Sequence, residues 1–240
     1  MTQSPVLKKP TTFSQYKALL AKDLRQEFRT RDMLTSMGIY AVLVLIVFGA
    51  AFSQMPADFD IIPISGGLIW ALIVFTSLLG LNRSFSHEKE EGSLQGILLV
   101  PLDRAVIFLS KATSNLIFLL LVEIITIPLF YFFFLSRSDA SETLWLVVAP
   151  LLVGTIGIVG IGTLLATITM GTRGKDVLLA VLFIPLSYPL LFACVSATTA
   201  AIVGDFDFVS TFVPALAMAG GYDVVMILVS WLLYDYVVSA

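Results

Sequence analysis

The sequence predicts an all-α integral membrane protein with six transmembrane helices, preceded by an amphipathic helix at the membrane surface. Three observations lead to this fold class. Hydrophobic residues make up 58% of the 240 residues and charged residues only 13%, and the mean hydropathy is +0.96. Such a chain is far too apolar for a soluble domain. Its apolar residues also fall into six long runs, and its basic residues gather between alternate runs.

Each apolar run is long enough to cross a bilayer, because a helical span takes about 20 apolar residues. The predicted segments are residues 35–55, 61–82, 106–135, 143–169, 177–203 and 209–238. We therefore divide the chain into residues 1–34, a tail with the amphipathic helix, and residues 35–240, a six-helix transmembrane domain.

The amphipathic helix is predicted between Thr12 and Asp32, where apolar residues recur every three or four positions. The apolar positions are Phe13, Tyr16, Leu20, Leu24 and Phe28, and the basic residues between them are Lys17, Lys22, Arg25 and Arg29. This pattern is typical of a helix on an anionic membrane surface, with its basic side chains extended toward the lipid headgroups. We expect it to contact membrane lipid and not nucleic acid.

The basic residues also predict the orientation of the chain. Of the 14 Lys and Arg residues, only Arg137 falls in a loop on the side opposite to the amino terminus. Cytoplasmic loops carry the excess of Lys and Arg in membrane proteins, so both termini are expected in the cytoplasm. The outer loops carry acids instead, namely Asp58, Asp60, Asp139, Glu142, Asp205 and Asp207.

The sixth apolar segment is too long for a single upright span, since about 30 residues at a rise of 1.5 Å exceed a hydrocarbon core of about 30 Å. Pro214 and the pair Gly220–Gly221 suggest a break. We therefore predict a short re-entrant or interfacial helix over residues 206–218 on the outer side and a final span over 221–238. Asp223 then lies near the outer interface, where it ionises at little cost.

Glu123 is the main intramembrane polar candidate, because it lies near the middle of the third segment. An ionised side chain there costs about 2.5–3.5 kcal/mol on insertion scales, so such residues are usually functional. Two roles stay open: a direct part in transport, or a hydrogen-bonded glutamate that joins two helices, with Thr126 nearby on its own helix. Lys111 and Asn115 share a face at the inner end of this segment, where Lys111 can reach the surface, and we expect a structural role for both.

The fourth segment carries four glycines at mostly helical spacing, and these are Gly154, Gly157, Gly160 and Gly162. Small residues allow a neighbouring helix to approach closely. We expect this packing inside the subunit or against a second copy of the chain. Cys194, the single cysteine, lies in an apolar run and is interpreted as a small buried hydrophobic residue.

The stretch FSHEKEEGSLQGILLVPLDR, residues 85–104, is the longest strongly charged interruption between apolar segments. Leu94, Ile97 and Leu98 form one apolar face of a helix, acids lie beside that face, and Pro101 ends it. A short helix of this kind suits docking into a groove on a partner outside the bilayer. The alternative is a solvated loop on the lipid headgroups.

The pattern Phe85-x-x-Glu88-x-x-Glu91-Gly92-x-Leu94, followed by Leu98, Leu99, Pro101 and Lys111, resembles the signature of the cytochrome c maturation protein B family. Glu stands at 88 and 91 where the family has Asp at one or both positions, which keeps the charge. The resemblance continues in residues 21–25, 115–128 and 177–189, and so covers nearly the whole chain.

This resemblance implies an ABC-2-like permease architecture and a haem exporter permease subunit of an ABC transporter in the inner membrane of a prokaryote. It implies that residues 85–104 carry a coupling helix on an ATPase subunit, which binds the ATP. It also implies haem as substrate, a second haem-handling membrane subunit as partner, and an outer re-entrant element before the last span. The coupling positions are Phe85, Glu88, Glu91, Gly92, Leu94, Leu98 and Pro101.

Sequence motifs of catalysis are absent. The run Gly171-Thr172-Arg173-Gly174-Lys175 lacks the spacing of a phosphate-binding P-loop, so we expect ATP hydrolysis on a separate chain and no catalytic residue here. His87, the lone histidine, lies among acids and is more simply solvated than a haem-iron ligand, and no metal or directly bound cofactor is expected. Two other functions stay open, namely an exporter permease for a drug, lipid or glycan, and a membrane scaffold without transport activity.

The aromatic run Phe130-Tyr131-Phe132-Phe133-Phe134 ends the third segment at its outer face. Aromatic side chains are enriched at membrane interfaces, so we expect this cluster to anchor the helix there. A wall that contacts haem is the alternative.

Overall fold

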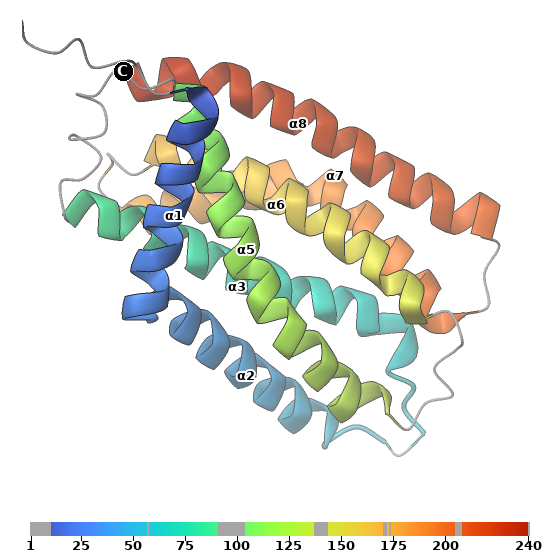
Figure 1. Cartoon of the computed structure of the whole chain (residues 1–240). Helices are drawn as coiled ribbons and strands as arrows, with labels where there is room; N and C mark the ends of the chain where they lie inside the picture. The colour runs from blue at the N-terminus through green and yellow to red at the C-terminus, as the bar shows by residue number, and fades with distance from the viewer. Residues whose placement is uncertain are drawn as a thin grey trace, which may run out of the picture.

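The computed structural model describes residues 11–56, 58–90, 104–136, 144–169, 172, 174–204 and 208–239, and for residues 85–90, 104, 208 and 235–239 only the backbone. Every element in these ranges is helical (Figure 1). The α-helices are α1 (Thr12–Thr30), α2 (Asp32–Phe52), α3 (Ile62–Glu90), α5 (Arg104–Phe130), α6 (Val148–Thr169), α7 (Lys175–Val203) and α8 (Val213–Ser239). Short turns of π-helix (Tyr131–Leu135 and Phe208–Phe212) and of 3₁₀-helix (Leu144–Val147) extend three of them, α5 at its carboxyl end and α6 and α8 at their amino ends.

Six of these helices are long and apolar enough to cross a membrane, as the sequence predicted. The spans are Asp32–Phe52, Ile62–Ser84, Ala105–Leu135, Leu144–Thr169, Lys175–Val203 and Val209–Tyr234. Their outward surfaces carry large apolar side chains, and Trp145, Val177 and Val209 are each at least 70% exposed. A surface of this kind suits contact with lipid, because the bilayer core solvates apolar side chains and not polar ones.

Helix α1 lies across one end of the bundle, at an angle to the long helices, and α8 ends close to it (Figure 1). Its contact face combines part of the apolar stripe with polar residues. Leu24 packs against the core and Phe13 is 65% exposed, whereas the polar residues Gln15 and Asp23 are buried against the bundle. The predicted helix is therefore confirmed, and part of its stripe points away from the protein while polar groups bind it to α5.

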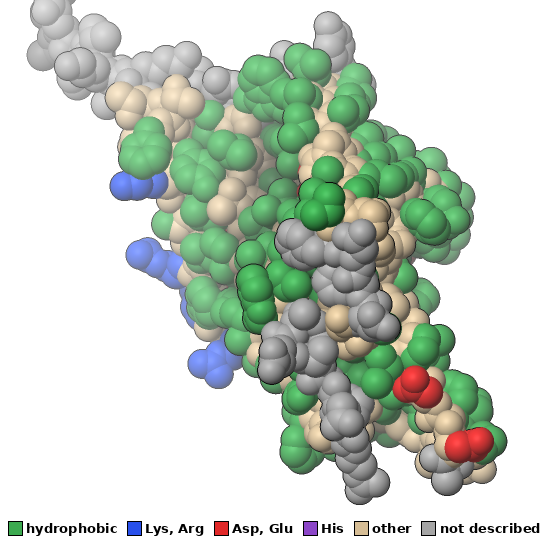
Figure 2. Space-filling view, turned by 90° about the vertical axis from the view of Figure 1, so that its right-hand side faces the viewer, with side chains coloured by type: hydrophobic (Ala, Val, Ile, Leu, Met, Phe, Trp, Pro, Cys, Tyr) green, Lys and Arg blue, Asp and Glu red, His purple; other side chains and the backbone are tan. Residues whose placement is uncertain are grey.

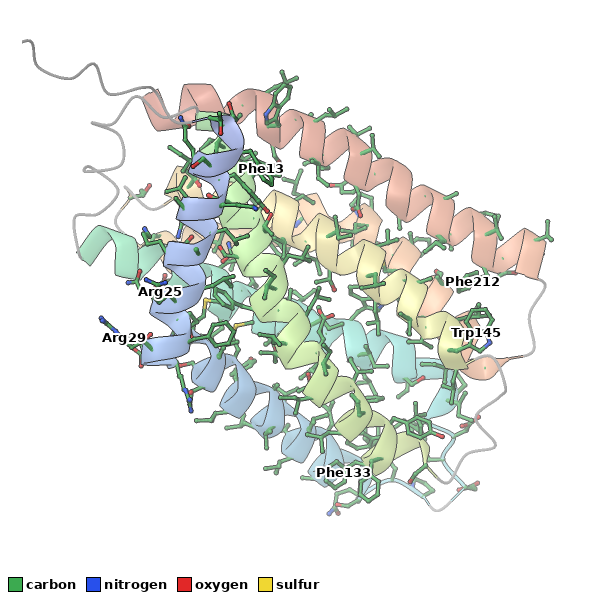
Figure 3. The ribbon with its side chains drawn as sticks, in the orientation of Figure 1. Phe13, Arg25, Arg29, Phe133, Trp145 and Phe212 are labelled. Carbon is green, nitrogen blue, oxygen red and sulfur yellow. The ribbon has the colours of Figure 1, made fainter. Side chains whose placement is uncertain are left out.

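The described Lys and Arg residues gather at one end of the bundle. Figure 2 shows Lys and Arg side chains on one side of the molecule and Asp and Glu side chains near the opposite end of the face in view, although α1 itself also carries Asp23 and Glu27. Arg25 and Arg29 mark the first end, and Phe133, Trp145 and Phe212 mark the second (Figure 3). The two ends of the bundle are thus chemically distinct, as the distribution of Lys and Arg in the sequence predicted.

The predicted break in the last segment is wrong. Helix α8 continues from Val213 to Ser239 through both Gly220 and Gly221. Pro214 follows closely on the π-helical turn Phe208–Phe212, and the chain continues into α8 without a break at this residue. The glycines keep their helical hydrogen bonds because exposed backbone polar groups are costly in a bilayer. Asp223 consequently lies inside the span and is only 5% exposed, not at the outer interface.

The core lies around α3 and α6, whose spans are the most buried, while α2 and α8 are the most peripheral. Trp70 of α3 is 1% exposed, and its indole Nε1–H donates to the hydroxyl oxygen of Thr198 in α7 at 2.9 Å. Cys194 is fully buried, as its apolar surroundings predicted. Large side chains of α3 thus fill the centre of the bundle, and they fit there because α6 presents glycines to them.

Candidate functional site

The glycines of α6 are contact points for three neighbouring helices, as the sequence predicted. A Cβ atom on Gly154 would lie 2.1 Å from the Trp70 ring, and one on Gly162 would lie 2.2 Å from Leu81. A Cβ on Gly160 would lie 3.0 Å from Ile227. The close approach lies within the subunit, between α6 and the helices α3 and α8. The sequence allowed this packing either inside the subunit or against a second copy of the chain. The structure accounts for these glycines without a second copy.

Gly157 makes room for the carboxyl group of Asp223. A Cβ at Gly157 would lie 1.9 Å from Asp223 Oδ1 and 2.5 Å from Leu190 of α7. Asp223 Oδ1 has no hydrogen-bond partner among the described residues. The adjacent Tyr222 donates its hydroxyl hydrogen to the backbone carbonyl of Leu186. The carboxyl group of Asp223 therefore lies between α6, α7 and α8 in the middle of the span. The expected helix break placed it near the membrane interface instead.

Glu123 lies on the opposite side of α6 and is hydrogen-bonded to it. The Thr155 hydroxyl donates to Glu123 Oε1 at 2.8 Å, and Glu123 is 6% exposed. Thr126, expected near Glu123, donates its own hydroxyl to the carbonyl of Val122. The hydrogen-bond partner of Glu123 thus comes from α6, 32 residues along the chain. The spacing of residues within one helix could not indicate this partner.

A second polar contact joins the same two helices in register with the first. Asn115 Nδ2 donates to Thr163 Oγ1 at 3.3 Å. Asn115 precedes Glu123 by eight residues and Thr163 follows Thr155 by eight, so the two contacts lie about 12 Å apart along antiparallel axes. Buried polar side chains that bond across helices restrict rotation and sliding. Helices α5 and α6 are therefore aligned as one unit.

Asn115 also faces a small pocket between four helices. The pocket is lined by α2, α3, α5 and α6 through Met33, Met37, Ser77, Gly80, Leu81, Asn115, Leu119 and Val159. Asn115 Oδ1 has no hydrogen-bond partner in the described residues. The Asn115 amide thus lies where α2, α3, α5 and α6 come together.

Near the start of α5, the Lys111 side chain is not extended toward the membrane surface, although the sequence allowed that position. It is 7% exposed, and its Nζ lies 3.0 Å from Asp23 Oδ2 of α1. The Ser114 hydroxyl donates to the same carboxylate oxygen at 3.4 Å. Sequence reasoning missed Asp23 as the partner, although both residues belong to segments that carry the family resemblance.

The coupling positions fall at the edge of the described chain. Phe85 and Glu88 continue α3 in the same helix, which ends at Glu90, and their side chains are not described. Glu91, Gly92, Leu94, Leu98 and Pro101 lie outside the described residues, as does the side chain of His87. The end of α3 and the start of α5, which flank these positions, both lie at the end of the bundle that α1 crosses (Figure 1).

The aromatic run at the carboxyl end of α5 is divided between two environments. Phe132 and Phe133 are 66% and 63% exposed, while Phe130 is fully buried. Phe134 packs edge-on against Phe52 of α2 with ring centroids 5.8 Å apart. The outward rings are placed as interfacial anchors would be, and the inward rings hold α5 against α2.

Six membrane-crossing helices, with their polar side chains turned inward and linked between helices, define a polytopic membrane protein of the permease class. The model of the CcmB protein family matches residues 14–233. The chain belongs to this family.

Relatives of known name cover most of the chain. A protein of Rhodobacter capsulatus named "Heme exporter protein B" is 31% identical over 73% of this chain and 78% of its own length. Proteins of the same name from Pseudomonas aeruginosa and Escherichia coli K12 are 28% and 29% identical. They cover 79% and 75% of this chain, and 82% and 79% of their own lengths. The similarity therefore extends over the helical bundle and beyond any single motif.

Proposed function

We propose that this chain is the membrane permease subunit of an ABC transporter complex in cytochrome c maturation, which exports haem or drives release of a haem–chaperone complex. The observation that carries the proposal is the match of the CcmB family over residues 14–233. The name shared by the relatives gives haem as the substrate. The inward polar contacts and the six spans are those expected of a transporter subunit.

ATP hydrolysis takes place on a separate ATPase subunit, which docks on the segment between α3 and α5. Phe85, Glu88, Glu91, Gly92, Leu94, Leu98 and Pro101 are the proposed coupling residues. The carboxylates hold polar contacts with the ATPase, Gly92 permits close approach, and the leucines fill a groove. A second, haem-handling membrane subunit and a second copy of this chain complete the partners.

The protein lies in the inner membrane with the α1 end of the bundle in the cytoplasm. The basic residues at that end and Asp58 and Asp60 at the other support this orientation. Residues 1–34 then form the cytoplasmic tail with the interfacial helix, and residues 35–240 form the permease domain. Phe13, Arg25 and Arg29 face away from the bundle, where lipid headgroups would meet them.

Glu123 aligns α5 with α6 so that displacement of the inner end of α5 reaches the middle of the bundle. Its hydrogen bond to Thr155 supports this structural role. A direct role in transport is the second candidate, favoured by the rarity of carboxyl groups at such depth.

The test is haem staining of c-type cytochromes in membranes of cells that lack this protein, with and without re-expression. We expect stained bands to disappear in the deletion, to return with the wild type, and to stay absent with Glu91→Ala. Glu90→Ala is the matched control, since it removes a neighbouring charge outside the motif. Immunoblots verify equal amounts of each variant in the membrane.

The alternatives have different outcomes. If the bands persist in the deletion and no redundant maturation pathway exists, haem is excluded and an exporter of a drug, lipid or glycan remains. If no ATPase co-purifies with the wild-type protein, the permease assignment is replaced by a membrane scaffold.

A further inference from the structure

Helix α1 is attached to α5 by a buried ion pair. Asp23 Oδ2 lies 3.0 Å from Lys111 Nζ, and each side chain is 8% exposed. The contact is extended on both sides: the Tyr16 hydroxyl donates to Thr113 Oγ1 at 3.1 Å. The ring of Phe28 packs edge-on against Phe118 with centroids 6.4 Å apart. These contacts follow α1 over most of its length.

A buried ion pair is a poor means of adding stability, because desolvation offsets most of its attraction. The best-attested role of a buried ion pair is to fix one alignment between the two segments that carry it. Lys111 is long enough to extend along the bundle toward water, but its ammonium group is directed at a carboxylate on a different helix. The pair therefore specifies where α1 sits on α5.

The other end of α1 is attached to α2. Arg31, the residue between the helices, has φ 58°, a left-handed conformation that is uncommon for residues other than glycine. Its N–H donates to the carbonyl of Glu27 at 2.6 Å. The Glu27 carboxylate in turn accepts the N–H of Leu34 in the first turn of α2 at 2.8 Å. Because that N–H has no intrahelical partner, Glu27 caps α2 and fixes the corner between the helices.

We propose that α1 is a strut that couples the inner end of α5 to α2. Asp23 and Lys111 are positioning residues on the α5 side, and Glu27 is the positioning residue on the α2 side. The inference rests on the proposed function, in which the ATPase acts on the segment directly before α5. When the ATPase displaces α5, α1 transmits this displacement to α2. The two helices then move together, although they are not consecutive in the chain.

The decisive variant inserts Gly-Ser-Gly-Ser after Arg31, which leaves α1 on α5 but disconnects it from α2. The matched control inserts the same residues after Asp58, in the loop at the other end of α2. We expect the Arg31 insertion to abolish haem staining of c-type cytochromes while ATP hydrolysis by the co-purified complex continues. The Asp58 insertion should retain both activities. Normal staining with the Arg31 insertion would overturn the strut.

A reporter shows whether α1 stays docked. Gln15→Cys, at a buried position, should react slowly with maleimide, and Ala18→Cys, at an exposed position of α1, should react fast. Asp23→Lys should raise the Gln15→Cys rate at least about tenfold, since it breaks a buried pair, and should abolish staining. Combining it with Lys111→Asp should restore both. Ser14→Ala, an exposed change on α1, should alter neither.

These outcomes separate the strut from the proposed function. If deletion of the protein leaves the cytochromes stained, the haem function fails. If deletion removes the stain but Asp23→Lys keeps it while Gln15→Cys becomes reactive, the function stands and the strut fails. If the Arg31 insertion itself undocks α1, the charge swap of Asp23 and Lys111 becomes the deciding experiment. Failure of that charge swap to restore staining would also count against the strut.

Discussion

Two buried aspartates of this protein have opposite environments. Asp23, in α1 at one end of the bundle, is 9% exposed and meets Lys111 and Ser114. Asp223, in the middle of α8, is 5% exposed, and its Oδ1 has no partner among the described residues. Asp23 is held by attraction to a cation, whereas Asp223 is accommodated by the missing side chain of Gly157. Burial alone therefore does not reveal what a carboxyl group does in this fold.

The difference follows from position along the bundle. A lysine near the end of a span can supply a positive charge at modest cost, because its chain stays close to the polar interface. In the middle of the bilayer a lysine costs about 2.5–3.5 kcal/mol on insertion scales. Among the described residues no Lys or Arg forms an ion pair with Asp223. We therefore expect substitutions at Asp23 and Asp223 to differ in how much they destabilise the protein. We also expect different second substitutions to restore stability at the two sites.

The largest effect is expected for Lys111→Met, which leaves Asp23 buried with only the more exposed Lys22, whose Nζ lies 3.4 Å from Asp23 Oδ1. Loss of one partner of a buried pair costs about 3–5 kcal/mol. The double variant Asp23→Asn with Lys111→Met removes both charges and should recover most of that loss. Thermal unfolding of the purified protein in detergent measures the difference, and equal midpoints for the single and double variants would show that the pair is not coupled.

Gly157→Ala should have the next largest effect, because its Cβ would lie 1.9 Å from Asp223 Oδ1 and 2.5 Å from Leu190. Overpacking of this kind costs about 1–3 kcal/mol. Gly38→Ala is the control, since nothing lies within 4 Å of its Cβ. Asp223→Ala should rescue part of the loss in the same unfolding measurement. If Gly157→Ala and Gly38→Ala unfold alike, α6 and α8 are not in contact at this point.

Glu123→Val should cost about 1 kcal/mol, because it leaves the Thr155 hydroxyl without its partner. Glu123→Gln keeps an acceptor for that hydroxyl and should retain wild-type stability. Haem staining then distinguishes the two roles of this residue. Retained staining with Glu123→Gln indicates alignment of α5 and α6, whereas its loss at unchanged stability indicates a direct part in transport.

Asp223→Asn should have the smallest effect, below about 1 kcal/mol, since the amide has the same shape and no hydrogen bond to Oδ1 is lost. The unfolding midpoint should stay close to that of the wild type. Asp23→Asn, the same change at the other aspartate, should lower the midpoint clearly because the buried Lys111 then loses its carboxylate partner. A large effect at Asp223 would mean that this carboxyl group has a partner in the assembled complex.

Hydropathy and charge by themselves determined the architecture of this protein. The six spans, the helix from Thr12 to Thr30, the contact glycines of α6 and the intramembrane position of Glu123 follow from the sequence. Each is a property of one segment: about 20 apolar residues cross the bilayer, and a glycine lacks a side chain wherever it lies. The excess of Lys and Arg at one end likewise needs no knowledge of which helices are neighbours.

Only the tertiary structure decided which polar groups meet. Asp23 and Ser114 lie 91 residues apart, and Thr155 reaches Glu123 only because α5 and α6 have one relative rotation. The break expected at Gly220–Gly221 was wrong for a related reason. Local signals describe the preference of an isolated chain, whereas the bilayer and the neighbouring helices keep α8 continuous and bury Asp223. Partners depend on packing between distant segments, which no single stretch of sequence contains.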